Sequence, residues 1–185
     1  MTSTRSRVLA LTFVLLAACT PAPSSAPPSA SPSAEPSVAA ACPVVETSGP
    51  LASDRLVDIT IESTPTADIV TFVLGERSSA PTNPTGKFSA IEPPFSQSGS
   101  GEAVDVPGAH HVEIRLEGML LSNDDGTSAY EGAFRFDPNL AALRSLVNVD
   151  AFEGHFTWIG GYDGLGCVTL LPNPAPNTFA VSFGH

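Results

Sequence analysis

The sequence predicts an all-β fold, an antiparallel β-sandwich of about eight strands with at most one short helix. Short segments alternate between apolar and polar residues at a period of two, which is the pattern of strands. Turn-forming residues rich in Gly, Asn and Asp separate them at 99–101, 123–126 and 160–161. Only 15% of the 185 residues are charged, too few to solvate a long helix or a coiled coil.

The clearest predicted strand spans residues 111–117, because every second residue there is apolar. Residues 56–62 alternate in the same way, with Val57 on the apolar face. The denser apolar segment 69–74 predicts a strand that is buried on both faces. Five further short strands are expected at 132–136, 146–152, 155–159, 168–171 and 178–183.

One short helix of about two turns is expected at residues 137–144. Asp137 is a favourable N-cap, and Pro138 suits the first helical position because its missing N–H would have no partner there. Leucine, alanine and arginine follow it. No other segment favours a helix.

Residues 1–18 predict a lipoprotein signal peptide. Arg5 and Arg7 precede an apolar run at 8–18 that reaches only about half of a ~30 Å hydrocarbon core, too short to span a membrane. The run ends in Leu16-Ala17-Ala18-Cys19, which resembles the lipobox of bacterial lipoproteins. In that motif the Cys is diacylated at its thiol, and cleavage then leaves this Cys as the first residue. Cys19 is therefore the predicted lipidation site, and an ordinary secretory signal is the alternative.

Residues 19–41 are expected to form the lipidated Cys and a disordered linker. Between Thr20 and Ala41 there are 6 Pro, 6 Ser and 7 Ala, and prolines at this density prevent helices and sheet ladders. Fully extended at ~3.1 Å per residue, the linker would reach about 70 Å. The protein is thus expected on the extracytoplasmic face of the cell membrane, held there by its lipid anchor.

Residues 42–185 are expected to form one domain. Cys42 opens this domain and Cys167 lies near its end, and in an exported protein two remaining cysteines predict a disulfide. The alternative is a reactive thiol pair or a metal site. Such sites use a close C-x-x-C spacing, which these two residues lack.

The charge balance and the titratable residues exclude several functions. The chain has 8 Lys and Arg against 19 Asp and Glu, a formal net charge of −11, so no nucleic-acid partner is expected. The four histidines do not fall at zinc-binding spacings, and Ser100 lacks the frame of a nucleophile elbow. We therefore expect no enzyme activity, no metal and no cofactor.

Aromatic residues and one histidine are the remaining candidates for ligand contact, each on a weak signal. Phe156 and Trp158 share a strand face, which we expect to be core; if it faced outward, it would offer a platform for sugar rings or peptide. Tyr162 follows two glycines, is expected to be exposed, and is the stronger candidate. Trp158 and His111 complete the set.

Five segments between residues 55 and 185 follow one another in an order that is typical of a known domain family: 67–74, 99–101, 112–118, 152–161 and 179–185. The most specific runs from Phe152-Glu153-Gly154 to Trp158. Together they resemble the AMIN-like domain of bacterial lipoproteins, a relative of the AMIN domain that precedes cell-wall amidase catalytic domains. The resemblance implies a β-sandwich that attaches noncatalytically to peptidoglycan or to an envelope protein.

A second function remains open from the composition. A high apolar content with few charges permits a carrier that holds a small apolar or lipidic ligand between its sheets. A large apolar cavity would favour this carrier, and a filled core would disfavour it.

Overall fold

The computed structural model describes residues 42–171 and 175–185, and these residues form twelve strands and no helix. The chain divides into two units, 1–37 and 38–185, and all described residues belong to the second. The predicted signal peptide, Cys19 and the linker to residue 41 lie outside the described residues. The all-β prediction is confirmed. None of the described residues belongs to a helix with the length and apolar character needed to cross a membrane.

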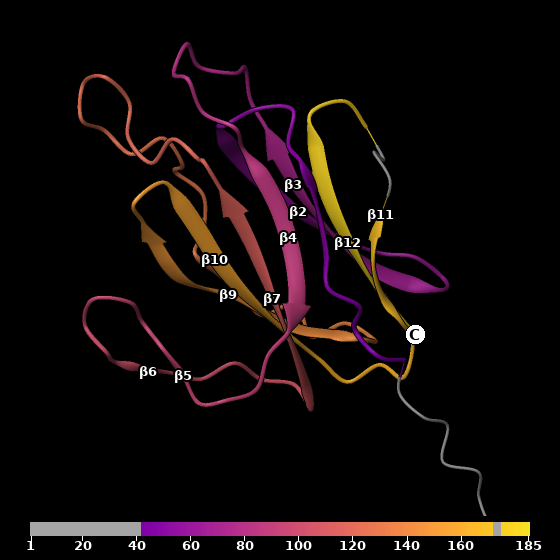
Figure 1. Ribbon diagram of the computed structural model, residues 1–185. Helices are drawn as coiled ribbons and strands as arrows, with labels where there is room; N and C mark the ends of the chain where they lie inside the picture. Colours follow the sequence, from indigo (N-terminus) through magenta and orange to yellow (C-terminus); the bar gives the residue numbers. More distant parts are fainter. Residues whose placement is uncertain (1–41, 172–174) are drawn as a thin grey trace, which may run out of the picture. The chain divides into compact units, whose positions relative to one another are not determined.

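The strands form two antiparallel sheets and a separate two-stranded ribbon (Figure 1). The larger sheet has the order β1-β4-β7-β10-β9-β8, with bounds Thr47–Pro50, Thr85–Ala90, His110–Glu117, His155–Tyr162, Leu143–Phe152 and Arg135–Phe136. The smaller sheet has the order β11-β12-β3-β2, with bounds Val168–Leu171, Thr178–Gly184, Ala67–Leu74 and Leu56–Ser63. The ribbon consists of β5 (Phe95–Ser96) and β6 (Ala103–Val104).

The main core lies between the two sheets. Trp158 of β10 meets Phe72 of β3 edge-on, with ring centroids 6.1 Å apart, so the rings join one sheet to the other. Both side chains are fully buried, as is Phe183 of β12. Burying large aromatic side chains is the main stabilising contribution in a sandwich of this kind. The prediction that Phe156 and Trp158 belong to the core is confirmed.

A second, smaller core lies on the outer face of the larger sheet, under the β5–β6 ribbon. Phe95 of the ribbon packs here with Val147 of β9 and Ile159 of β10. These two strands are therefore buried on both faces. The prediction that 69–74 is such a strand is wrong, because β3 alternates between buried and half-buried residues and only its inner face meets the core. The ribbon covers the larger sheet, which the local sequence could not reveal.

The predicted disulfide between Cys42 and Cys167 is confirmed, with Cα atoms 4.7 Å apart. It fastens the start of the domain to the residue before β11. Gly184, at the end of β12, donates its N–H to the Cys167 carbonyl at 3.1 Å. The disulfide thus joins the beginning and the end of the domain at one end of the sandwich.

The short helix expected at 137–144 does not form. Residues 137–142 form a loop, and Leu143 begins β9. The buried carboxylate of Asp68 accepts the backbone N–H groups of Ala142 and Leu143 at 2.7 and 2.9 Å. Asp137, the expected N-cap, instead binds the Arg135 guanidinium at 2.8 Å. Tertiary hydrogen bonds therefore override a favourable local pattern.

The predicted inner face of 56–62 is wrong at one position. β2 shifts its register against β3 between Leu56 and Asp58, so a bulge turns Val57 outward while Leu56 and Ile59 are buried. A bulge adds one residue and reverses the alternation on one side of it.

Residues 160–161, predicted as a turn, lie inside β10. Gly161 is required by close packing, because a Cβ atom there would lie 2.0 Å from the Pro107 carbonyl oxygen. That oxygen also accepts the Ser145 hydroxyl at 2.8 Å, which fixes its position.

Gly161→Ala is expected to lower the free energy of unfolding by about 1–3 kcal/mol, because the loop before β7 must move to admit a methyl group. Chemical denaturation measures this change. Gly49→Ala is the matched control, since a Cβ at that strand glycine meets no atom within 4 Å. Equal effects of the two substitutions would contradict the steric explanation.

Candidate functional site

A β-bulge near the end of β9 creates the candidate site. Asn148 and Asp150 pair with successive residues of β10, so Val149 between them has no partner in that strand. The Val149 carbonyl instead accepts the N–H of Ser98 at 2.9 Å, from the loop between β5 and β6. Bulges bend a strand and re-aim its side chains. This one attaches the tip of the ribbon to the end of β9.

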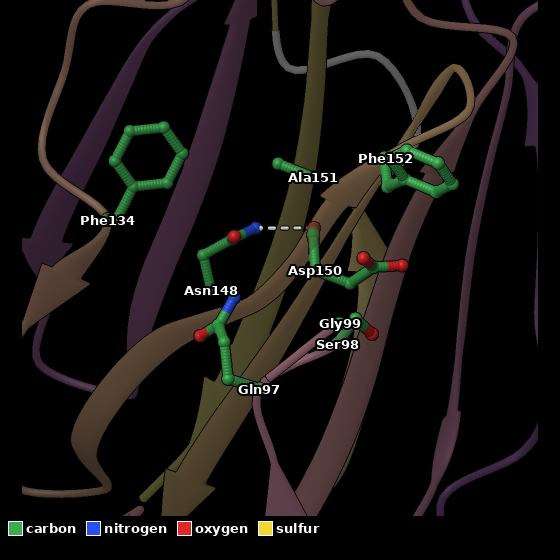
Figure 2. A pocket seen from close by; sticks show the side chains of 8 residues that line it. All are labelled: Gln97, Ser98, Gly99, Phe134, Asn148, Asp150, Ala151 and Phe152. Carbon is green, nitrogen blue, oxygen red and sulfur yellow. Dashed lines mark hydrogen bonds between the residues drawn. The ribbon is translucent and has the colours of Figure 1, made fainter. Parts of the chain in front are cut away.

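The Asn148 side chain makes hydrogen bonds to both strands at the bulge. Its Nδ2 donates to the backbone oxygens of Asp150 and Thr157 at 3.0 and 3.1 Å, so both amide hydrogens are used within the protein. Figure 2 shows the first of these bonds. No donor among the described residues reaches its Oδ1, which therefore remains an acceptor for a ligand.

An open groove of about 470 Å³ lies over the bulge. Its volume falls in the range of sites that hold small molecules or one or two sugar rings. Phe134 and Phe152 lie on opposite sides of the groove, with Asn148 and Asp150 between them (Figure 2). The eight lining residues come from the β5–β6 loop, from the segment before β8 and from β9: Gln97, Ser98, Gly99, Phe134, Asn148, Asp150, Ala151 and Phe152.

Both phenylalanines expose large apolar areas, 44% for Phe134 and 63% for Phe152. Phe134 is nevertheless held firmly, because its inner face stacks on Trp158 with centroids 6.2 Å apart and planes 4° from parallel. Tyr130 meets it edge-on at 5.4 Å. One face of the Phe134 ring is therefore part of the core, and the other is presented to the groove.

Tyr130 also fixes the loop that carries Phe134. Its hydroxyl donates to the Ala133 carbonyl at 2.9 Å. Burial, with a smaller contribution from the Asp58 carboxylate, raises the pKa of Tyr130 to about 12. The hydroxyl thus stays protonated at any physiological pH and keeps this bond.

The groove lining contains one acidic residue and no basic residue. Asp150 is the only charged residue that lines it, and its Oδ2 lies 2.5 Å from His155 Nε2. Both side chains are mostly buried, which fixes the carboxylate in one orientation. No Lys or Arg is among the lining residues. The groove therefore offers fixed acceptors and two aromatic rings, but no fixed cation for an anionic ligand.

The groove and the disulfide lie at opposite ends of β10. The far end of the strand, at Tyr162, contacts Phe183 at a centroid distance of 5.6 Å, next to the residue that binds Cys167. The near end forms the β9–β10 hairpin beside the groove. Strands rise about 3.3 Å per residue, so the separation is roughly 20–25 Å. In Figure 1 the same hairpin lies away from the C-terminus and from the first described residues.

The structure does not bring the three predicted contact residues together. Tyr162, expected to be exposed, is only 6% exposed and packs in the core, where burial raises the pKa of its hydroxyl. Trp158 is fully buried and supports Phe134 from behind. His111 lies under the ribbon, with its ring 4.8 Å from Phe95 and Nε2 2.9 Å from the Val106 carbonyl oxygen. None of the three lines the groove.

The described part of the chain contains no cluster of side chains suited to a metal ion. There, no group of three or more His, Cys, Asp or Glu side chains converges on a point that could hold a metal ion. The 123–126 segment forms a turn, as predicted, closed by a bridge between Ser122 and Ser128.

Of three comparisons with known proteins, one gives a match, to a protein-family model. No curated protein and no solved structure matches the chain. The family model of the AMIN-like domain matches residues 54–175, which is more than half of the sequence and includes both walls of the groove. The chain therefore belongs to the AMIN-like domain family.

Proposed function

We propose that this protein is a noncatalytic binding module of the cell envelope, anchored by lipid at Cys19 on the extracytoplasmic face of the cell membrane. Its partner in this proposal is peptidoglycan or a protein of the envelope. Membership in the AMIN-like family supports a cell-envelope or peptidoglycan-binding role. The observation that carries the proposal is the open groove, with its two exposed aromatic walls, within the family-matched region.

The position of the groove supports a ligand away from the membrane. The linker enters the domain at Cys42, and the groove lies at the other end of β10. An extended linker of this length reaches about 70 Å. Because the groove lies at the opposite end of β10 from Cys42, an attachment through the residues before Cys42 would leave the groove accessible to a ligand.

The alternative, a carrier for an apolar ligand between the sheets, has no specific support. The space between the sheets is filled by fully buried aromatic side chains, among them Trp158, Phe72 and Phe183. The groove lies at the edge of the larger sheet and has polar groups between its aromatic walls, so it does not resemble a lipid cavity.

Binding to the cell wall is expected in a sedimentation assay with purified sacculi. The mature chain carrying Cys19→Ser avoids lipid-driven aggregation and is expected to sediment with sacculi at both low and high salt, since the groove has no basic residues to bind by charge. The same protein centrifuged without sacculi is the control for aggregation and nonspecific sedimentation. Protein that stays in the supernatant at both salt concentrations would contradict direct wall binding.

Lipidation at Cys19 has its own test. Cells fed an alkyne-labelled palmitate are expected to label the wild-type protein and to hold it in the membrane fraction. Cys19→Ala is expected to lose both the label and the membrane association. A variant that keeps the label would show that another residue carries the lipid, or that the signal works differently.

A further inference from the structure

We propose that the groove binds a sugar ring that carries no negative charge, held between Phe134 and Phe152. This inference rests on the proposed envelope function and names the chemistry and the residues of its site. It concerns the groove alone and depends on the two rings, the polar groups between them and the charge of the lining.

The two phenylalanines suit the faces of a pyranose ring. A sugar ring presents C–H groups on its flat faces, and aromatic side chains bind such apolar faces by stacking. Phe134 is already immobilised by Trp158, so little rotamer entropy is lost when a ligand contacts its free face. Phe152 extends from the end of β9 on the opposite side of the groove (Figure 2).

The polar groups between the rings suit the hydroxyls at the edge of a sugar. Asn148 Oδ1 is an acceptor without a donor from the described residues, and Asp150 has one oxygen that His155 does not contact. The Gln97 amide lies beside them and supplies both a donor and an acceptor. Because Asn148 and Asp150 are fixed by internal hydrogen bonds, they are oriented before the ligand arrives.

The charge of the site sets the ligand class. The groove contains the Asp150 carboxylate and no Lys or Arg, and the whole chain has a formal net charge of −11. A uronic acid or a phosphorylated sugar would bring like charges together without a partner, which costs binding free energy. An aliphatic chain would displace water from the Asn148 and Asp150 oxygens that line the groove and would supply no donor in its place. An uncharged sugar satisfies both constraints.

The test titrates the mature chain carrying Cys19→Ser with a β-1,4-linked N-acetylglucosamine tetramer, followed by calorimetry and by fluorescence. Trp158 is the only tryptophan, and it stacks directly behind Phe134, so its emission reports on the groove. Saturable binding with a change in Trp158 emission is expected. A galacturonate tetramer of the same length is expected to bind at least tenfold more weakly.

Phe152→Ala is the decisive variant, because this exposed side chain contributes little to folding. It is expected to weaken tetramer binding at least tenfold. Asp150→Asn tests the polar contribution and is expected to reduce the discrimination against galacturonate. Leu165→Ala is the matched control, since Leu165 is an exposed apolar residue outside the groove lining, and it is expected to bind like the unsubstituted chain.

The outcomes separate this inference from the proposed function. Sedimentation with sacculi that Phe152→Ala leaves unchanged would overturn the groove as the site and leave the envelope function standing. Tetramer binding without sacculus binding would support the groove and overturn wall attachment. Equal binding of both tetramers, or binding of neither, would overturn the proposed ligand class.

Discussion

Replacing Cys42 and Cys167 together with serine is expected to lower the free energy of unfolding by about 4–5 kcal/mol. The two residues are 125 positions apart in the sequence, so the disulfide closes nearly the whole domain into one loop. A cross-link across so long a loop removes a large part of the conformational entropy of the unfolded chain. This figure is the upper value that loop entropy gives.

The measurement is urea denaturation of the wild type and of the double serine variant, followed by Trp158 fluorescence. A strong reductant removes the same cross-link from the wild-type protein. The reduced wild type is therefore expected to unfold at the same urea concentration as the variant. Because the groove lies at the other end of β10, ligand binding by the folded variant is expected to be retained. A loss of less than 1 kcal/mol would mean that the sandwich does not depend on this cross-link.

The elements with the strongest local pattern were predictable from the sequence. Residues 111–117 alternate without interruption, and the structure forms β7 there with Val112, Ile114 and Leu116 fully buried. The disulfide was also predictable, because the sequence contains only two cysteines besides Cys19, the predicted lipidation site, and paired cysteines are expected in a domain predicted to be exported. The strand prediction depends only on the alternation within a few residues, and the disulfide prediction depends only on the number of cysteines.

The errors occur where distant parts of the chain decide the local structure. The segment 137–144 has favourable helix signals, but the Asp68 carboxylate, far away in the sequence, binds two of its N–H groups. Gly161 was predicted to lie in a turn from the two adjacent glycines alone. The contact that requires glycine there is with the Pro107 carbonyl, in the loop before β7, which is distant in the sequence. Alternation alone cannot reveal such contacts.

The candidate site was largely missed for the same reason. Its residues come from three segments, and the bulge at Val149 that brings them together depends on pairing with β10. Two local signals were nevertheless present. Asn148 interrupts the apolar run 146–149, and Phe152 directly precedes the Glu-Gly turn of a hairpin, where an apolar ring is left exposed. Phe134 gave no local signal.

Replacing Asp68 with alanine is the second change with a large expected effect, a loss of about 3–5 kcal/mol in the free energy of unfolding. Its carboxylate is fully buried and joins three elements of the fold. Oδ1 accepts the Ser63 hydroxyl at 2.6 Å and His185 Nε2 at 3.0 Å. Oδ2 accepts the two N–H groups that precede and begin β9. Alanine would leave all four donors without this acceptor.

Asp68→Asn separates the charge from the shape. It keeps one carbonyl acceptor and loses the negative charge, so it is expected to cost about half as much as Asp68→Ala. Asp124→Asn, in the exposed 123–126 turn, is the control for removing a surface carboxylate and is expected to leave the unfolding transition in place. If Asp68→Ala unfolded at the same urea concentration as Asp124→Asn, the carboxylate would not be a structural anchor.

The pH dependence of stability supplies an independent check on the same residue. Burial by itself would raise the pKa of Asp68, but hydrogen bonds from Ser63, Leu143, His185 and Ala142 outweigh it and lower the pKa from 3.8 to about 2. A carboxyl with a lowered folded-state pKa contributes its full stabilisation above the unfolded value and loses it as the pH falls through the folded one. We therefore expect about 2 kcal/mol of wild-type stability to disappear between pH 4 and pH 2, measured by urea denaturation at each pH. Asp68→Ala is expected to lack this part of the acid dependence, and a variant that kept the wild-type slope would assign it to other carboxylates.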